Sequence, residues 1–435
     1  MQKYPTYKTS NIDWIGEIPS HWKVKKLKYF AQIMNGKDYQ EFVLEEGGYP
    51  VFGTGGIFAR CSKFLHNKPS VLLGRKGSVS NPQFVTEPFW TSDTTYYTDI
   101  KNDVEPMFLF HLVKQIQFDL YIYGSAIPSM NKSVYDDMLF PCPPLTEQQS
   151  IVAYLDEKTA LIDELMAKKE SKIALLKEQR AALINQAVTK GLNLNVKMKD
   201  SKIEWIGVVP EHWKYIPLKY VTLTERGIQT GPFGTQLNTK DYVDSGVKVL
   251  NQKTLIDEDY SLGEEYITLE KNKELKGFEV NSGDIILGTR GSFGTKNRTT
   301  FGKCSIVPND IGECVLHPCL IRIRLDEVLI TKEFFKYFVN ESTYFLDEIV
   351  HTSNSTTIEV IYGVTLKDIK FPLPPLSEQQ AIVAYLDEET SLIDKNIEIE
   401  QQKISTLKEY RQSLISNVVT GKVKVSPVAP DGGAF

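Results

Sequence analysis

The sequence predicts an α+β protein: two mixed α/β domains with two long helices that form an antiparallel coiled coil, in a pseudo-two-fold internal repeat. Two duplications support this prediction. Residues 143–157 recur as 374–388 with two mild differences, and residues 12–23 recur, less closely, as 203–214. We call the first pair the helix-start motif and the second pair the Trp-His motif. Because the inserts between the motifs differ in sequence, we expect two different domains in one repeated frame.

The motif spacing divides the chain into parts. The Trp-His copies are offset by 191 residues and the helix-start copies by 231, so the second insert is 40 residues longer. The predicted parts are a first domain (1–141), a first long helix (142–191), a polar linker (192–202), a second domain (203–372), a second long helix (373–422) and a disordered tail (423–435).

Composition limits the class of protein. With 41% hydrophobic and 24% charged residues, the chain is expected to be globular. It shows no signal-peptide pattern and no apolar run of about 18 residues, so no membrane span is predicted. The five cysteines are sparse, which fits free thiols in a reducing cytoplasm. The net charge of −5 lacks the basic excess typical of nucleic-acid-binding proteins, so phosphate contacts would need local patches or partner subunits.

Both inserts are predicted to have the same mixed α/β fold. Glycines divide each insert into short apolar runs, a pattern typical of short strands joined by turns. Apolar residues at helical spacing predict a helix near 106–116 in the first insert and near 333–338 in the second.

The helix-start motif opens two long helices. Thr146 with Gln149, and Ser377 with Gln380, fit capping boxes. A glycine follows each helical segment, at the place where helices commonly end: Gly191 and Gly421. At about 45 residues, each helix would span roughly 67 Å.

Each long helix carries an apolar seam with a spacing of about 3.5 residues. The seam residues are Ile151, Leu155, Ile162, Leu165, Ile173, Leu176, Leu183 and Ala187 in the first helix, and Ile382, Leu386, Ile393, Ile397, Ile404, Leu407, Leu414 and Val418 in the second. A lone helix with such a seam needs a partner. Its own repeat in antiparallel orientation is favoured. The alternatives are that each helix packs on its own insert or on another subunit.

No catalytic signature is visible. Gly288–Gly294 has the glycines of a P-loop without the Gly-Lys-Ser/Thr that must follow. Asn81–Phe84 is predicted as a turn, because Gln83 replaces the second proline of the amino-methyltransferase signature. The group Cys304, Cys314, His317 and Cys319 lacks the paired spacing of zinc ligands, so no metal is expected. These features favour a binding or scaffolding subunit.

The aromatic residues of the Trp-His motif are predicted to be structural. Trp14, Trp22, Trp205 and Trp213 are expected in the core. His21 and His212 have no second histidine or carboxylate cluster nearby in the sequence, and a catalytic histidine needs a positioned partner.

Two similar domains joined by a rigid helical pair suit a ligand with two spaced recognition sites, and DNA half-sites lie about 34–36 Å apart on one face of the duplex. In each insert a buried strand runs into a basic turn flanked by glycines, and Arg, Lys and Asn can recognise bases. The candidate contacts are Arg60, Lys63, Arg75, Lys76, Ser78 and Asn81 in the first domain, and Arg290, Ser292, Lys296 and Arg298 in the second.

The duplicated helix-start motif, with a Trp-Ile-Gly-x-x-Pro-x-His-Trp sequence ahead of each insert, resembles the specificity (S) subunits of type I restriction–modification systems. The resemblance covers nearly the whole chain. Residues 124–132 also resemble a loop at the end of the family's first recognition domain, and residues 351–357 resemble it loosely. These segments add the candidates Ser125, Asn131, Lys132, Ser353 and Asn354.

The resemblance implies a DNA-recognition role without catalysis. Each insert would be a target-recognition domain for one half of a bipartite sequence in double-stranded DNA. The helices would set the spacer and bind two methyltransferase (M) subunits, which carry S-adenosylmethionine and methylate adenine N6. Two restriction (R) subunits with ATP and Mg²⁺ could join. This chain would bind no cofactor itself and would act in a bacterial or archaeal cytoplasm.

Another class of function stays open. The chain could be a coiled-coil scaffold whose globular ends bind protein or glycan. A catalytic protein is a third reading. The sequence does not specify which bases would be recognised.

Overall fold

The computed structural model describes residues 2–12, 14–122, 128–202, 206–255, 258–290, 300–352 and 360–425. Contacts divide the chain into two compact units. Unit one comprises Met1–Glu170 and Glu400–Phe435, and unit two comprises Ser171–Ile399. Each unit therefore contains the beginning of one long helix and the end of the other.

Two four-stranded sheets form the body of unit one. The first has the order β10 (Trp90–Thr91), β6 (Tyr49–Gly53), β7 (Gly56–Cys61) and β5 (Val43–Leu44). The second has the order β4 (Ala31–Asn35), β11 (Thr95–Ile100), β8 (Ser70–Gly74) and β9 (Gln83–Val85). All of β8 is buried, as its apolar run predicts.

The remaining elements of unit one connect these sheets to the long helices. A hairpin of β1 (Tyr7–Thr9) and β2 (Glu17–Pro19) precedes β3 (Lys23–Lys26), which pairs with β12 (Leu139–Cys142). The helical elements are α1 (Pro106–Val113), α2 (Lys132–Asp137), η1 (Leu27–Tyr29), η2 (Gln40–Phe42) and η3 (Phe118–Leu120). Helix α1 confirms the helix predicted near 106–116.

Unit two repeats this plan with additions. One sheet has the order β16 (Ile228–Thr230), β24 (Leu320–Ile323), β21 (Ile285–Gly288) and β22 (Cys304–Ile306). The other has the order β17 (Tyr242–Val243), β19 (Tyr266–Ile267), β18 (Val247–Leu250), β23 (Cys314–Leu316) and β20 (Glu279–Val280). The parallel pair β18–β23 corresponds to the parallel pair β6–β10 of unit one.

The other elements of unit two also have counterparts. Strand β13 (Met198–Asp200) pairs with β14 (Val208–Pro210), and β15 (Lys214–Pro217) pairs with β25 (Lys370–Leu373). The helical elements are α4 (Leu269–Glu274), α5 (Lys332–Glu341), α6 (Tyr344–Thr352), α7 (Gly363–Asp368), η4 (Leu218–Tyr220), η5 (Thr239–Asp241) and η6 (Gln252–Leu255). Helix α5 confirms the helix predicted near 333–338.

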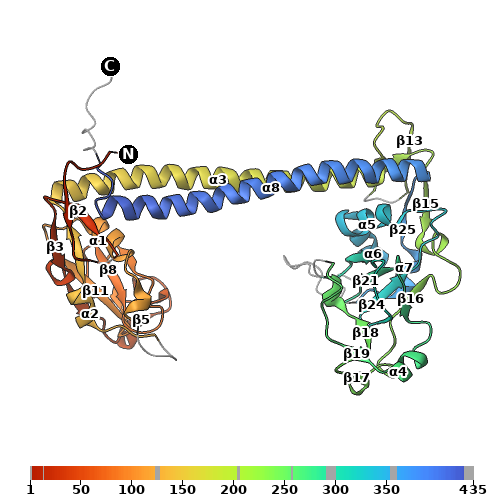
Figure 1. Cartoon of the computed structure of the whole chain (residues 1–435), viewed down its shortest axis with the longest axis horizontal. Helices are drawn as coiled ribbons and strands as arrows, with labels where there is room; N and C mark the ends of the chain where they lie inside the picture. The colour runs from red at the N-terminus through yellow and green to blue at the C-terminus, as the bar shows by residue number, and fades with distance from the viewer. Residues whose placement is uncertain are drawn as a thin grey trace. The chain divides into compact units, whose positions relative to one another are not determined.

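The two long helices, α3 (Leu145–Lys190) and α8 (Leu376–Val419), lie side by side and run antiparallel (Figure 1). In unit one, Asp163 Oδ1 lies 2.9 Å from Arg411 Nε, and Lys169 Nζ lies 2.8 Å from Glu400 Oε2. In unit two, Arg180 Nε lies 3.0 Å from Asp394 Oδ1. As the partner on α3 moves forward from Asp163 to Arg180, the partner on α8 moves back from Arg411 to Asp394, which confirms the predicted antiparallel coiled coil.

The helix seam extends into the core of each unit. In unit one, Leu155 and Val418 join Trp22 and Phe108 in one buried cluster. In unit two, Val188 and Leu386 join Trp213 in another. One seam prediction is wrong: Leu165 is 43% exposed. Leu161 and Leu165 stay on the outer surface of α3, because the neighbouring Ile162 and Met166 pack in the unit-one core instead.

The ends of the long helices differ in part from the prediction. Gly191 and Gly421 end the helices with positive φ values of 73° and 77°, as expected. The capping boxes are wrong, because α3 and α8 begin at Leu145 and Leu376, so Thr146 and Ser377 already lie inside the first turn. At the start of each long helix a buried glutamine makes the fixed contacts instead. It is Gln148 in α3 and Gln379 in α8, one position before the predicted Gln149 and Gln380.

These two glutamines bond each long helix to the domain that precedes it in the chain. Gln148 Oε1 accepts a hydrogen bond from the backbone N–H of Glu105, at the start of α1, at 2.9 Å, and its Nε2 donates to Pro143 O at 2.9 Å. Gln379 Oε1 likewise accepts from the N–H of Thr331, at the start of α5, at 2.8 Å. Apolar packing and these bonds together hold the helix starts in place.

Two other sequence-based predictions need adjustment. The tail was expected to be disordered from residue 423, but Val423 packs on the unit-one core and the Lys424 N–H donates to Gln2 O at 2.9 Å, so residues 423–425 belong to the fold. Residues 426–435 lie outside the described residues. The predicted linker 192–202 includes strand β13. Trp22 and Trp213 are fully buried, Trp14 is partly buried, and Trp205 lies outside the described residues.

Candidate nucleic-acid interface

The basic turn of unit one is built by backbone hydrogen bonds at the end of β8. The Arg75 N–H donates to Thr94 O at 2.9 Å, and Arg75 O accepts from the Met130 N–H at 3.0 Å. Lys76 pairs with Ser129 in an isolated bridge. The segment that returns from the 124–132 loop is therefore fixed against the turn, and Asn131 and Lys132 are brought close to Arg75 and Lys76.

The side chains of this turn point outward. Lys76, Ser78 and Asn81 are exposed, and Arg75 is half-buried, with its Nη1 donating to Asp93 O at 3.2 Å. Because β8 beneath them is apolar and fully buried, these polar side chains have no place in the core. Arg, Lys and Asn groups on a rigid sheet end can bind phosphates and base edges.

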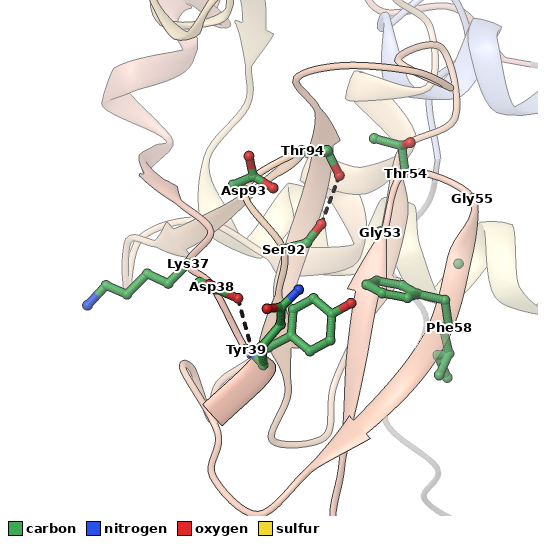
Figure 2. A pocket seen from close by; sticks show the side chains of 13 residues that line it. Lys37, Asp38, Tyr39, Gly53, Thr54, Gly55, Phe58, Ser92, Asp93 and Thr94 are labelled. Carbon is green, nitrogen blue, oxygen red and sulfur yellow. Dashed lines mark hydrogen bonds between the residues drawn. The ribbon is translucent and has the colours of Figure 1, made fainter. Parts of the chain in front are cut away.

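An open pocket of about 820 Å³ lies beside this turn (Figure 2). Thr54, in the tight turn between β6 and β7, accepts the Ser78 N–H at 3.3 Å and donates its hydroxyl to Lys76 O at 3.2 Å. Across the pocket, the rings of Tyr39 and Phe58 meet edge to face with centroids 5.2 Å apart. The pocket is lined by Lys37, Asp38, Tyr39, Gln40, Gly53, Thr54, Gly55, Gly56, Ile57, Phe58, Ser92, Asp93 and Thr94.

Unit two forms the same turn at the end of β21. The Thr289 N–H donates to Cys319 O at 3.1 Å, and Thr289 O accepts from the Ile361 N–H at 2.8 Å. Arg290 pairs with Val360 as Lys76 pairs with Ser129. Arg290 is therefore the equivalent of Lys76, and it is exposed.

A further shared feature is the loop that follows β4 in unit one and β16 in unit two. It passes so close to a neighbouring backbone that only glycine fits: a Cβ on Gly36 would lie 1.9 Å from Ser92 O, and one on Gly231 would lie 2.1 Å from His317 O. The first loop carries Lys37 and Tyr39. The second carries Phe233, which is 72% exposed.

Sequence reasoning missed several of these residues. Lys37, Tyr39, Phe58 and Phe233 were not among the candidates, although the two glycines mark the loops on which three of them lie. No sequence signal connects the β6–β7 hairpin to the basic turn, because the contacts are made by Thr54 with a backbone more than twenty residues away.

Some predicted candidates are not brought to the basic turns. Arg60 and Lys63 lie at the far end of β7 from Thr54. Arg60 Nη1 donates to Gly48 O at 3.0 Å, and Lys63 Nζ lies 4.2 Å from the centre of the Phe42 ring. Ser125, Ser292, Lys296, Arg298, Ser353 and Asn354 lie outside the described residues.

The Trp-His motif bonds to the start of a long helix and is not part of the candidate interface. Glu147, in the first turn of α3, accepts from Trp22 Nε1 at 3.1 Å and lies 2.9 Å from His21 Nε2. The Tyr4 hydroxyl also donates to Glu147, and burial together with this carboxylate raises the pKa of Tyr4. The carboxylate that the motif lacks in sequence therefore comes from the helix-start motif.

The same anchor recurs in unit two. Glu378 accepts from Trp213 Nε1 at 2.9 Å and lies 2.6 Å from His212 Nε2. Trp213 also packs against Gly191, where a Cβ would lie 3.1 Å from the indole ring. Each buried tryptophan thus joins the start of one long helix to the end of the other.

Burial shifts the pKa values of thiol and imidazole groups in the described part of unit two. Burial raises the pKa of Cys314 to about 12 and lowers the pKa of His317. Across the part of the chain that the structure describes, no cluster of three His, Cys, Asp or Glu side chains could hold a metal ion. Among the helices of the described ranges, none combines the length and apolar character needed to cross a bilayer.

Comparison with known proteins identifies the family. The type I restriction modification DNA specificity domain matches residues 19–175 and 238–409. The chain belongs to this specificity family. Each match runs from one insert into the long helix that follows it, in agreement with the internal repeat.

Individual members of the specificity family resemble the chain over nearly its whole length. The type I restriction enzyme MjaVIII specificity subunit of Methanocaldococcus jannaschii is 27% identical, with 94% of each chain covered. The EcoBI specificity subunit of Escherichia coli is 20% identical, with 95% of this chain and 88% of that chain covered.

Solved structures show the same fold. A chain from a study of complex assembly and conformational transition of the type I R-M system has a TM-score of 0.67 at 16% identity, covering 93% of this chain and 99% of that chain. The HsdS subunit from Thermoanaerobacter tengcongensis has a TM-score of 0.55 at 16% identity, covering 93% and 98%.

Proposed function

We propose that this chain selects the DNA target of a type I restriction–modification complex, with each unit recognising one half of a bipartite sequence. The observation that carries the proposal is the pair of basic turns. Lys76 and Arg290 occupy equivalent positions on equivalent strands, each held by a returning segment. Around them, the β6–β7 hairpin of unit one and the longer β18–β19 connection of unit two differ, so two different half-sites are expected.

The chemistry around the turns fits DNA. Lys and Arg side chains can contact guanine or phosphate, and Asn131 or Asn81 can contact adenine. The apolar Ile57 and Phe58, each 53% exposed, can contact a thymine methyl group. The net charge of −5 means that other subunits contribute part of the phosphate binding.

The catalytic and cofactor functions belong, in this proposal, to partner subunits. Two methyltransferase subunits with S-adenosylmethionine would bind the long helices and methylate adenine N6, and restriction subunits with ATP and Mg²⁺ would join where they exist. Leu161 and Leu392 support this. They occupy equivalent positions in the two helices and are 53% and 52% exposed, so both helices present the same apolar position to a partner.

The basic turns provide a direct test. In the complete complex, Arg75→Ala with Lys76→Ala should weaken discrimination at the half-site of unit one by about 1–3 kcal/mol. Arg290→Ala should act on the other half-site. Binding is measured on the target duplex and on duplexes with one half-site scrambled.

Two basic residues of unit one serve as matched controls. Arg60→Ala and Lys63→Ala remove exposed cations that lie away from the turn, so half-site discrimination should not change. Equal effects of control and turn variants on both half-sites would contradict the proposal. Domains without any sequence preference would favour a scaffold that binds protein or glycan.

A further inference from the structure

A group of three exposed residues recurs in both units, away from the basic turns. In unit one it comprises Lys28 and Tyr29 of η1 and Asp137 at the end of α2. In unit two, Lys219 and Tyr220 of η4 and Asp368 at the end of α7 occupy the equivalent positions. We call these groups the recurrent triads.

The two triads have a similar geometry, although in unit one Lys26 Nζ lies nearer to Asp137 Oδ1, at 2.8 Å, than Lys28 does. Lys28 Nζ lies 3.4 Å from Asp137 Oδ1 and 5.7 Å from the centre of the Tyr29 ring. Lys219 Nζ lies 2.6 Å from its aspartate and 5.5 Å from the centre of its tyrosine ring. In both triads the lysine side chain is 44% exposed and the aspartate 60%. The tyrosines are 52% and 63% exposed.

The fold explains the position of the triads but not their exposed side chains. The backbone turn is fixed by buried leucines, whose N–H groups donate to Met138 O at 2.8 Å in unit one and to Ile369 O at 2.9 Å in unit two. A surface ion pair between lysine and aspartate contributes at most about 1 kcal/mol. A tyrosine with more than half its surface in water adds little to packing, so stability does not account for its presence in both copies.

Other exposed positions nearby have changed since the duplication. Glu17 of unit one corresponds to Val208 of unit two, and Leu139 corresponds to Lys370, and all four side chains are exposed. The triads have kept all three residues, although Lys26 beside the first triad corresponds to Pro217 beside the second. A shared binding function therefore explains them better than incomplete divergence.

We propose that each recurrent triad is a contact surface for a methyltransferase subunit, used once per unit and separate from the long helices. This inference rests on the proposed function, which supplies a partner that binds twice. A partner present in two identical copies needs the same residues in both units. The recognition surfaces, in contrast, must differ if the half-sites differ.

Residue type and location favour a protein over a DNA phosphate. In unit two the lysine of the triad donates to its aspartate at 2.6 Å, so that triad carries no net charge. In unit one Asp137 lies 2.8 Å from Lys26 as well as 3.4 Å from Lys28, so the charge there is positive and does not decide between the two ligands. Exposed tyrosine is enriched in protein interfaces. Helix α2 begins beside the basic turn and the triad lies at its other end, next to β12, which leads into α3.

The test measures binding of the purified cognate methyltransferase subunit to the full chain by calorimetry and sedimentation. Wild-type chain should bind two copies. Tyr29→Ala and Tyr220→Ala should each weaken one binding event roughly tenfold, and the double variant should weaken both. Tyr362→Ala is the matched control, because Tyr362 is 62% exposed and precedes α7, at the other end of that helix from Asp368.

Phenylalanine variants separate binding from folding. Tyr29→Phe with Tyr220→Phe keeps the rings, so binding should stay close to wild type, and melting temperatures of all variants should match. Unchanged binding by the double alanine variant would overturn the inference alone. A loss confined to DNA affinity would also overturn it, because the triads would then be phosphate contacts. Wild-type chain that binds no methyltransferase subunit would overturn both this inference and the proposed function.

Discussion

At the scale of single residues, one carboxylate in each unit connects the two repeated motifs. Glu147 bonds to Trp22 and Glu378 bonds to Trp213, and both indoles are fully buried. A buried N–H without an acceptor costs free energy that solvent cannot restore. This requirement gives a physical reason for the glutamate at the third position of each long helix.

Removing this acceptor should destabilise the unit that contains it. We expect Glu147→Ala to lower the free energy of unfolding of unit one by about 1–3 kcal/mol, because Trp22 Nε1 loses its partner. Chemical denaturation followed by tryptophan fluorescence measures the change. Glu157→Ala, at a glutamate that is 57% exposed on the same helix, should stay within about 0.5 kcal/mol. Equal effects of the two variants would contradict the role of Glu147.

A partly buried histidine predicts acid sensitivity of unit one. Burial, with smaller effects of Lys114 and Arg411, lowers the pKa of His111 from 6.5 to about 4. At pH values between about 4 and 6.5 the unfolded chain therefore binds more protons than the folded chain. The free energy of unfolding falls as the pH drops through this range. His111→Gln should flatten this part of the curve of unfolding free energy against pH. An unchanged slope in the variant would rule out His111 as the cause.

At the scale of elements, the two long helices could largely be predicted from the sequence, whereas much of the candidate nucleic-acid interface could not. The seam spacing and Gly191 and Gly421 predict two long helices, because periodicity and helix ends are local properties. The capping boxes failed because the helices begin directly after Pro144 and Pro375, so the hydroxyls of Thr146 and Ser377 come two positions too late to be N-caps. The pocket beside Lys76 depends on tertiary contacts of Thr54, which no local pattern encodes.

The contrast between two leucines of α3 tests the observed seam. Leu155 is fully buried in the unit-one core and Leu165 is 43% exposed, although both fit the apolar spacing. Leu155→Ala should cost about 2–5 kcal/mol of unfolding free energy, and Leu165→Ala should stay within about 0.5 kcal/mol. Denaturant titration of both variants is the measurement. A large loss for Leu165 alone would show that the predicted seam was right and the observed one wrong.

At the scale of the whole molecule, one repeated frame carries two different inserts. Because α3 and α8 each pass from one unit into the other, their length is expected to set the spacer between half-sites. Inserting seven residues into both helices, after Glu170 and after Ile399, preserves the heptad seam and adds about 10 Å, or roughly three base pairs. Mapping modified sites should show a spacer longer by about that amount. An unchanged spacer would exclude the helices as the determinant of spacing.

The central claim is that each insert alone determines one half-site. The most direct measurement is a genome-wide map of N6-methyladenine in cells that carry the native chain or a chain whose residues 25–140 come from a relative with another specificity. The account predicts that one half of the modified sequence changes, while the other half and the spacer stay the same. A change in both halves, or in neither, would contradict it.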